Sequence, residues 1–269
     1  MKTKVLVMDM DGTLLNSQKK ISTATKEAIQ EILKRGHKVI LASGRPTPGM
    51  RPYELELELE KYGGYLLSFN GACIVECRTG EIIYQKTLPS VLLPGLYHFA
   101  RESECGLATH LENEAISAFV PDRYITMEAH MNGMSVRMVE NFIDFVDFDV
   151  YKCLMTAEPE RAAVLEKQLQ EKYGNVASIY RSDPYFIEVM PKNVDKATSL
   201  SRMLEMIGIG LEDTICCGDG FNDLSMIKCA GVGVAMGNAQ PEVKAAADYI
   251  TADNDSDGLV EVIKVLFAE

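Results

Sequence analysis

Two aspartates, Asp9 and Asp11, stand one residue apart directly after a short apolar run near the start of the chain. The run, residues 5–8, is typical of a buried strand, and Gly12 with Thr13 favours a sharp turn after it. Carboxylates this close together are unfavourable unless a cation or a shared proton neutralises them. We therefore interpret the end of this strand as a site for a divalent metal and a phosphoryl group.

Segments of strand length alternate with amphipathic segments of helix length in the first and last parts of the chain. The predicted strands span residues 5–8, 38–42, 65–69, 214–217 and 233–236. The predicted helices span residues 22–34, 54–60, 196–207, 223–229, a segment after residue 241, and 258–267. Such alternation indicates a parallel sheet with helices on both faces. The predicted fold class is α/β, with a doubly wound, Rossmann-like parallel sheet.

Residues 54–60 alternate strictly between glutamate and leucine, which matches the period of a strand. We predict a helix instead, because glutamate is depleted in strands and both residue types favour helices. A helix would also provide the crossover that neighbouring parallel strands need.

The middle of the chain has a different pattern. Prolines near both of its ends, among them Pro89 and Pro184, interrupt the alternation. The elements predicted there are helices at residues 92–105 and 158–173 and strands at residues 135–139, 151–155 and 185–190. We predict a core domain over residues 1–83 and 191–269 and an inserted α+β cap domain over residues 84–190.

Composition excludes several classes of function. The formal net charge of −12 disfavours a nucleic acid as partner. No apolar run approaches the length of a membrane span, and the run before Asp9 is too short for a signal peptide. The seven cysteines are odd in number and scattered, unlike a disulfide framework. We expect a cytoplasmic protein with reduced thiols and no membrane partner.

Four groups of polar residues follow predicted strands. They are Asp9 with Asp11, Ser43-Gly44-Arg45, Asn70-Gly71, and Asp219 with Asn222 and Asp223. In open parallel sheets, ligands bind beyond the carboxyl ends of the strands. Chance could place one such group there, but four together indicate a binding site.

The first group suits phosphoryl transfer. Asp9 can attack phosphorus and form an aspartyl-phosphate. Asp11 can reach the same phosphate from its other side, protonate a leaving oxygen and then deprotonate water. Mg²⁺ suits the site because it prefers oxygen ligands and keeps places for water and phosphate oxygens.

The other groups can hold a phosphate. The Ser43 hydroxyl and the Gly44 N–H could bind a phosphate oxygen, whereas Arg45 could reach the substrate or form part of a structural turn. A lysine at the start of the helix predicted from residue 196 would add positive charge at an anion-binding helix end. Spacing alone does not separate Lys196 from Lys192.

The last group could complete the metal site. Asp219 could bind a metal together with Asp9, and Asn222 could donate its amide N–H to phosphate. Asp223 could hold Lys196 or a metal-bound water. A glycine-rich turn capped by Asp223 is the ordinary alternative.

With these residues in place, the chain resembles a phosphatase of the haloacid dehalogenase superfamily, most closely the Cof-type subgroup with a class IIB α+β cap. The resemblance lies in residues 9–15 (Asp-Met-Asp-Gly-Thr-Leu-Leu), residues 42–46 (Ala-Ser-Gly-Arg-Pro), Lys196, and residues 218–223 (Gly-Asp-Gly-Phe-Asn-Asp). Residues 231–239 (Gly-Val-Gly-Val-Ala-Met-Gly-Asn-Ala) also resemble the subgroup's characteristic tail. One departure is the segment Asn-Val-Asp-Lys-Ala around Lys196, where the subgroup often has Gly-Val-Ser-Lys-Gly.

The resemblance implies a role for each residue. Asp9 would be the nucleophile and Asp11 the general acid and base. Mg²⁺ would bind the Asp9 carboxylate, the Asp11 backbone carbonyl and Asp219. The phosphate would be held by the Met10 backbone N–H, Ser43, Gly44, Lys196 and Asn222. The resemblance also selects Lys196 over Lys192.

We therefore expect an Mg²⁺-dependent phosphatase that hydrolyses small phosphorylated metabolites, sugar phosphates above all, through phospho-Asp9. The inserted cap would set the choice of substrate. A phosphomutase that uses the same four segments is one alternative. A non-catalytic ligand sensor is another, although the presence of Asp9, Asp11, Lys196 and Asp219 together argues against it.

Overall fold

The computed structural model describes residues 3–268, which form two compact units. One unit comprises the chain up to Tyr84 and from Asp195 onwards, and we call it the core unit. The other, Gln85–Val194, is the inserted unit. The predicted domain boundaries stay a prediction. No helix within residues 3–268 is long and apolar enough to cross a membrane.

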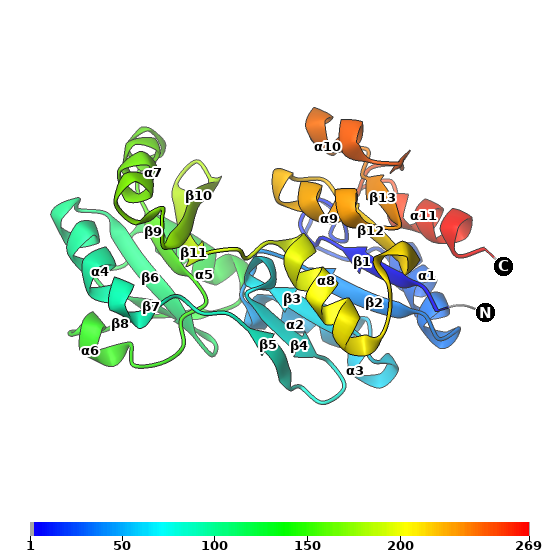
Figure 1. The fold of residues 1–269 in the computed structure, drawn as a ribbon, viewed down its shortest axis with the longest axis horizontal. Helices are drawn as coiled ribbons and strands as arrows, with labels where there is room; N and C mark the ends of the chain where they lie inside the picture. Colours follow the sequence, from blue (N-terminus) through cyan, green and yellow to red (C-terminus); the bar gives the residue numbers. More distant parts are fainter. Residues whose placement is uncertain (1–2, 269) are drawn as a thin grey trace. The chain divides into compact units, whose positions relative to one another are not determined.

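An eight-stranded sheet forms the centre of the core unit, in the order β14-β13-β12-β1-β2-β3-β4-β5 (Figure 1). The strands are β1 (Val5–Met8), β2 (Lys38–Ala42), β3 (Tyr65–Ser68), β4 (Cys73–Glu76), β5 (Ile82–Gln85), β12 (Thr214–Gly218), β13 (Val232–Ala235) and β14 (Tyr249–Ile250). The pairs from β14 to β3 are parallel, and β4 runs antiparallel to β3. All four residues of β1 are buried, as expected for a parallel strand covered on both faces.

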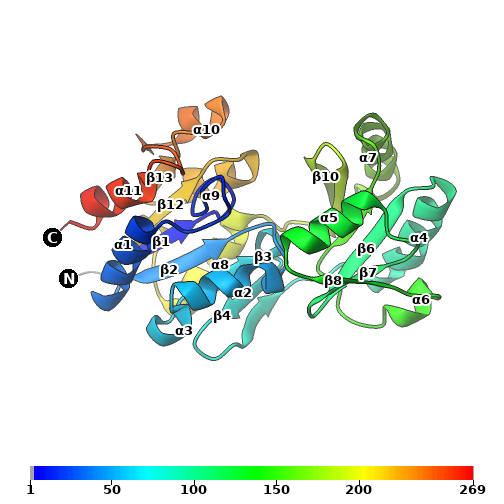
Figure 2. The same ribbon diagram turned by 180° about the vertical axis from the view of Figure 1, so that it is seen from behind.

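Helices cover both faces of this sheet. They are α1 (Thr23–Lys34), α2 (Thr47–Glu56), α3 (Leu59–Tyr62), α8 (Lys196–Ile207), α9 (Leu224–Cys229), α10 (Pro241–Ala246) and α11 (Gly258–Leu266). Helices α8 and α9 lie on one face, whereas α1 and α11 lie on the other (Figures 1 and 2). On the α8 face, Val5 and Val7 of β1 pack with Leu200 and Met203 of α8. The prediction of a doubly wound α/β core is confirmed.

Local signals fix the ends of helices α1 and α8. Ser22 caps α1 by accepting a hydrogen bond from the Thr25 N–H. The Asp195 side chain caps α8 in the same way through the Thr198 N–H. Gly208 ends α8 in the left-handed conformation (φ 69°), which a residue without a Cβ adopts readily. The helix predicted over residues 196–207 is therefore confirmed.

The inserted unit contains a six-stranded sheet in the order β10-β11-β9-β6-β7-β8. Its strands are β6 (Gly106–Leu111), β7 (Glu114–Ser117), β8 (Ser135–Met138), β9 (Cys153–Thr156), β10 (Ala177–Asp183) and β11 (Phe186–Pro191). Its helices are α4 (Leu93–Glu102), α5 (Arg123–Met131), α6 (Phe142–Phe145) and α7 (Pro159–Tyr173). Leu96 of α4 and Leu169 of α7 pack with Leu107 and Ile187 of the sheet. This unit is the α+β insertion that the sequence predicts.

The alternating segment at residues 54–60 is helical, but it is not one helix. Helix α2 ends at Glu56 and α3 begins at Leu59, because Glu58 adopts the left-handed conformation (φ 56°). Leu57 is fully buried beside this break, whereas Leu55 is 65 % exposed on α2. The prediction of a helix rather than a strand is confirmed, and the prediction of an unbroken helix is wrong.

Substitution of these two leucines should separate burial from sequence pattern. Leu57→Ala should lower the free energy of unfolding by about 2–5 kcal/mol, because it removes buried methyl groups and leaves a cavity. Leu55→Ala should change it by no more than about 0.5 kcal/mol, because the side chain is already in water. Urea unfolding of both variants tests this, and equal destabilisation would contradict the placement of Leu57 in the core.

Candidate active site

The four polar groups gather at the carboxyl ends of neighbouring strands in the core sheet. Asp9 follows β1, Ser43 follows β2 and Asp219 follows β12. Because β1 pairs with β2 on one side and β12 on the other, Asp9 lies between the other two loops. Asn70 follows β3 and donates its backbone N–H to the Ser43 carbonyl (2.8 Å). The sheet topology therefore brings together segments that are far apart in the sequence.

A buried lysine joins two of the aspartates. The Lys196 ammonium lies 2.5 Å from Asp9 Oδ1 and 2.6 Å from Asp223 Oδ1, and all three side chains are buried. Lys196 reaches this position because it is the first residue of α8, whose N-terminus faces the ends of the strands. Of the two lysines that spacing left open, Lys196 is the one that contacts Asp9.

The electrostatic environment of Asp9 is unusual. Burial, reinforced by the negative charge of Asp223, raises the pKa of the Asp9 carboxyl to about 8, against the opposing effect of Lys196. Burial on its own would lower the pKa of Lys196, but the carboxylates of Asp223 and Asp9 outweigh it and raise the pKa. The single positive charge of Lys196 is therefore not enough to return the pKa of Asp9 to its ordinary value.

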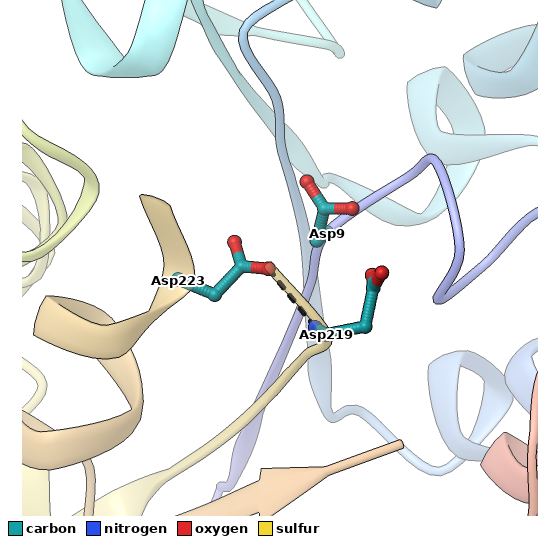
Figure 3. Close-up of side chains that lie close together, drawn as sticks. All are labelled: Asp9, Asp219 and Asp223. Carbon is teal, nitrogen blue, oxygen red and sulfur yellow. Dashed lines mark hydrogen bonds between the residues drawn. The ribbon is translucent and has the colours of Figure 1, made fainter. Parts of the chain in front are cut away.

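Asp219 adds a third carboxylate. Oxygens of Asp9, Asp219 and Asp223 lie within 4.8 Å of one another (Figure 3). Burial, followed by the charge of Asp223, raises the pKa of Asp219 to about 6, although a hydrogen bond from Thr13 opposes the shift. Three carboxylates around one ammonium leave an excess of negative charge, and oxygen donors are the ligands that Mg²⁺ prefers. The residues present therefore fit a divalent cation.

Asp223 uses both carboxylate oxygens. Oδ1 binds Lys196, and Oδ2 accepts the backbone N–H groups of Asp219 and Gly220, each at 3.0 Å (Figure 3 shows the bond to Asp219). The side chain thus fixes the loop that carries Asp219 and the lysine that contacts Asp9. This arrangement fits the expectation that Asp223 supports the site by holding Lys196.

Asp11 lies in different surroundings from Asp9. Arg45 donates Nε to Asp11 Oδ2 (2.6 Å) and Nη2 to Oδ1 (2.8 Å), and Lys19 Nζ lies 2.7 Å from Oδ1. Burial tends to raise the pKa of Asp11, but the hydrogen bonds and charge of Arg45, with those of Lys19, lower it to about 2. The Asp11 carboxylate is therefore outside the cluster of three carboxylates. The metal role predicted for Asp11 concerns its backbone carbonyl and stays a prediction.

The loop after β2 is shaped for close approach. Ser43 is buried, and its Oγ accepts the Arg45 N–H (3.2 Å). A Cβ on Gly44 would lie 3.3 Å from the Asn70 amide, so glycine allows the two loops to pack together. Arg45 contacts Asp11 in this structure. The sequence alone leaves two roles open for Arg45, a contact with substrate and part of a structural turn.

The two remaining predicted phosphate ligands differ in exposure. Met10 is fully buried, so its side chain is not available to a ligand. Asn222 lies on a short 3-10 helix, Phe221–Asp223, and its side chain is exposed. The roles of both residues stay predictions.

Sequence reasoning missed three residues that contact the site. Thr13 donates its hydroxyl to Asp219 Oδ1 (2.9 Å), Lys19 binds Asp11, and the Asn238 amide donates to the Gly12 carbonyl (2.8 Å). Thr13 lies in residues 9–15 and Asn238 in residues 231–239, both of which carry the family resemblance. Their contact partners, Asp219 and Gly12, are 206 and 226 residues away in the chain. No local pattern distinguishes Lys19 from an ordinary surface lysine.

Comparison with known proteins agrees with this geometry. The family described as haloacid dehalogenase-like hydrolase matches residues 6–263. The putative phosphatase YxeH of Bacillus subtilis is 31 % identical, and the match covers 98 % of each chain. The 5-amino-6-(5-phospho-D-ribitylamino)uracil phosphatase YcsE of B. subtilis is 30 % identical, covering 97 % of this chain and 94 % of YcsE.

Solved structures of the same family superpose on nearly the whole chain. A haloacid dehalogenase-like hydrolase from Bacteroides thetaiotaomicron has a TM-score of 0.95 at 42 % identity, covering 99 % of this chain and 100 % of the other. The sugar phosphatase BT4131, of subclass IIB, has a TM-score of 0.83 at 27 % identity, covering 98 % and 99 %. The chain therefore belongs to the haloacid dehalogenase-like hydrolases, and it is a phosphatase of the type that carries an inserted α+β unit.

Proposed function

We propose that the protein is an Mg²⁺-dependent phosphatase that hydrolyses small phosphate monoesters through phospho-Asp9. The proposal rests on the hydrogen bonding of the Asp9 carboxylate. Its Oδ1 binds Lys196, while no hydrogen bond from within residues 3–268 reaches Oδ2. Oδ2 is therefore available to attack phosphorus once the carboxyl is ionised, which a divalent cation beside it would favour, and Lys196 holds the carboxylate in a fixed orientation.

The proposed reaction has two steps. In the first, Asp9 forms a bond to phosphorus as the ester bond breaks, and Asp11 gives a proton to the leaving oxygen. In the second, Asp11 takes a proton from water as the water attacks phospho-Asp9, which releases phosphate. Because Arg45 and Lys19 keep Asp11 ionised in the free enzyme, the negative charge of a bound phosphate is what would raise its pKa.

The surrounding residues would hold the phosphate and the cation. Mg²⁺, held by Asp9, Asp219 and the Asp11 carbonyl, would supply the positive charge that attracts a phosphate towards a cluster of carboxylates. The phosphate would meet the Ser43 hydroxyl, the backbone N–H groups of Gly44 and Met10, and the Asn222 amide. Lys196 adds a buried positive charge beside them.

The substrate class we propose is sugar phosphates and related phosphorylated metabolites. Two relatives support this choice by their names, since BT4131 is a sugar phosphatase and YcsE acts on a phosphorylated ribityl compound. We also propose that the protein acts in the cytoplasm. All seven cysteines are free thiols, which agrees with a reducing compartment.

Replacement of the nucleophile tests the mechanism. Asp9→Asn keeps the size of the side chain but cannot form the acyl phosphate, so kcat should fall at least about 10³-fold. The variant should remain folded, because the amide has the same size as the carboxyl group and its oxygen can still accept the hydrogen bond from Lys196. Phosphate release from a panel of sugar phosphates is the measurement. Normal turnover by Asp9→Asn would contradict the mechanism, and a wild-type requirement for a bisphosphate activator would favour a phosphomutase.

Removal of the metal tests the cofactor. Chelation should abolish phosphate release, and Mg²⁺ at a hundred times its Kd should stabilise the fold by about 2.7 kcal/mol. Asp219→Asn should lose most of this stabilisation because it removes a charged ligand. Asp147→Asn, at an exposed position in the inserted unit, should keep it. Urea unfolding with and without Mg²⁺ measures the effect, and equal stabilisation of both variants would exclude Asp219 as a ligand.

A further inference from the structure

Asn238 belongs to the segment 231–239, to which the proposed reaction assigns no task. It lies in the loop after β13, and its side-chain amide joins two other loops. Nδ2 donates to the Gly12 carbonyl (2.8 Å), and Oδ1 accepts the Asn254 backbone N–H (3.1 Å). The second contact fixes the orientation of the amide, because only the oxygen can accept from a backbone N–H.

The Gly12 carbonyl belongs to the Gly12–Thr13 peptide, in the loop after Asp9, and this peptide lies against Asp219. Gly12 has a φ of +90°, and a Cβ at this position would lie only 2.4 Å from Asp219 Oδ2. Thr13, on the other side of the same peptide, donates its hydroxyl to Asp219 Oδ1 (2.9 Å). A rotation of this peptide would therefore change the close packing of Gly12 on the Asp219 carboxylate and the hydrogen bond from Thr13 to it.

The loop that carries Asn238 also holds the backbone of Asp219. The Gln240 N–H donates to the Asp219 carbonyl and the Met236 N–H donates to the Gly218 carbonyl, each at 3.0 Å. One loop thus fixes the main chain of Asp219 directly and, through Asn238, the peptide that packs on its carboxylate. The position of Asp219 relative to Asp9 depends on both connections.

We propose that Asn238 is a positioning residue for the divalent cation, acting through the Gly12–Thr13 peptide on the Asp219 carboxylate. The inference rests on the proposed function only in taking Asp9 and Asp219 as cation ligands. A residue that orients a metal ligand should affect metal affinity more than it affects stability. A bond that merely ties two surface loops together should do the opposite.

The chain offers a matched control for this distinction. Asn254 Nδ2 donates to the Leu15 carbonyl, also at 2.8 Å, so it is the same kind of bond to the same loop. The Leu15 carbonyl lies three residues beyond Gly12, and no hydrogen bond from Leu15 to Asp219 is present within residues 3–268. Asn254→Ala keeps the backbone N–H that orients Asn238. It removes one amide-to-carbonyl bond and leaves the Gly12 contact in place.

Calorimetric titration of the full chain with Mg²⁺ alone tests the proposal. Asn238→Ala should raise the Kd for Mg²⁺ about tenfold, and Asn238→Leu, which keeps the bulk of the side chain, should do the same. Asn254→Ala should bind Mg²⁺ as the wild type does. Urea midpoints without Mg²⁺ are measured beside the titrations: Asn238→Ala removes two exposed side-chain hydrogen bonds and Asn254→Ala removes one half-buried bond. A lower midpoint of Asn254→Ala with unchanged Mg²⁺ affinity makes stability a poor explanation of the difference in affinity.

A second readout is kinetic. If Asn238 acts through the cation site, saturating Mg²⁺ should restore the kcat of Asn238→Leu towards the wild-type value. Unchanged Mg²⁺ affinity in both Asn238 variants, or equal weakening in Asn254→Ala, would overturn the proposal. A wild-type protein that binds no Mg²⁺ would instead overturn the proposed function, so the two failures are distinguishable.

Discussion

The contact of Lys196 with Asp9 and Asp223 is the interaction on which the rest of the site depends. An unpaired Lys196 ammonium, buried as it is, would be strongly unfavourable. Pairing with Asp9 alone would leave the loop that carries Asp219 without the carboxylate of Asp223 that holds it. With two carboxylates, the lysine fixes Asp9 through one and the Asp219 loop through the other. The remaining excess of negative charge is the property that makes the site suitable for a divalent cation.

This interaction exists only because of the strand order. β1 lies between β2 and β12, so the loops that follow these three strands open at the same edge of the sheet. Helix α8 then places its first residue at that edge, where its N-terminus and the Lys196 ammonium both favour anions. The same topology makes the two halves of the core unit interdependent, although 110 residues of the inserted unit separate them in the chain.

The parts of the fold set by local physics could be predicted from the sequence. β1 is an unbroken apolar run, and α8 has a cap at Asp195 and a glycine at its end, so their limits follow from neighbouring residues. The break at Glu58 could not be predicted, because no glycine or proline marks it, and the burial of Leu57 and Leu59 on either side of it is a property of the tertiary fold. Lys19 and Asn238 were missed for a related reason, since their importance comes from partners that only the tertiary fold brings near.

The two aspartates of the first motif show how one fold gives similar groups different tasks. In a continuing strand, residues two apart would share a face and experience similar surroundings. Here β1 ends at Met8 and the chain turns, with the Leu14 N–H returning to the Asp9 carbonyl. Asp9 stays in the buried cluster of carboxylates, where its pKa is raised, whereas Asp11 meets two cations that lower its pKa. These opposite shifts belong to the site without cation or substrate: a divalent cation beside Asp9 would favour the ionised carboxylate that attack on phosphorus requires, and a bound phosphate would raise the pKa of Asp11 towards that of a proton donor. The turn at Gly12 is therefore as much a part of the site as the carboxylates on either side of it.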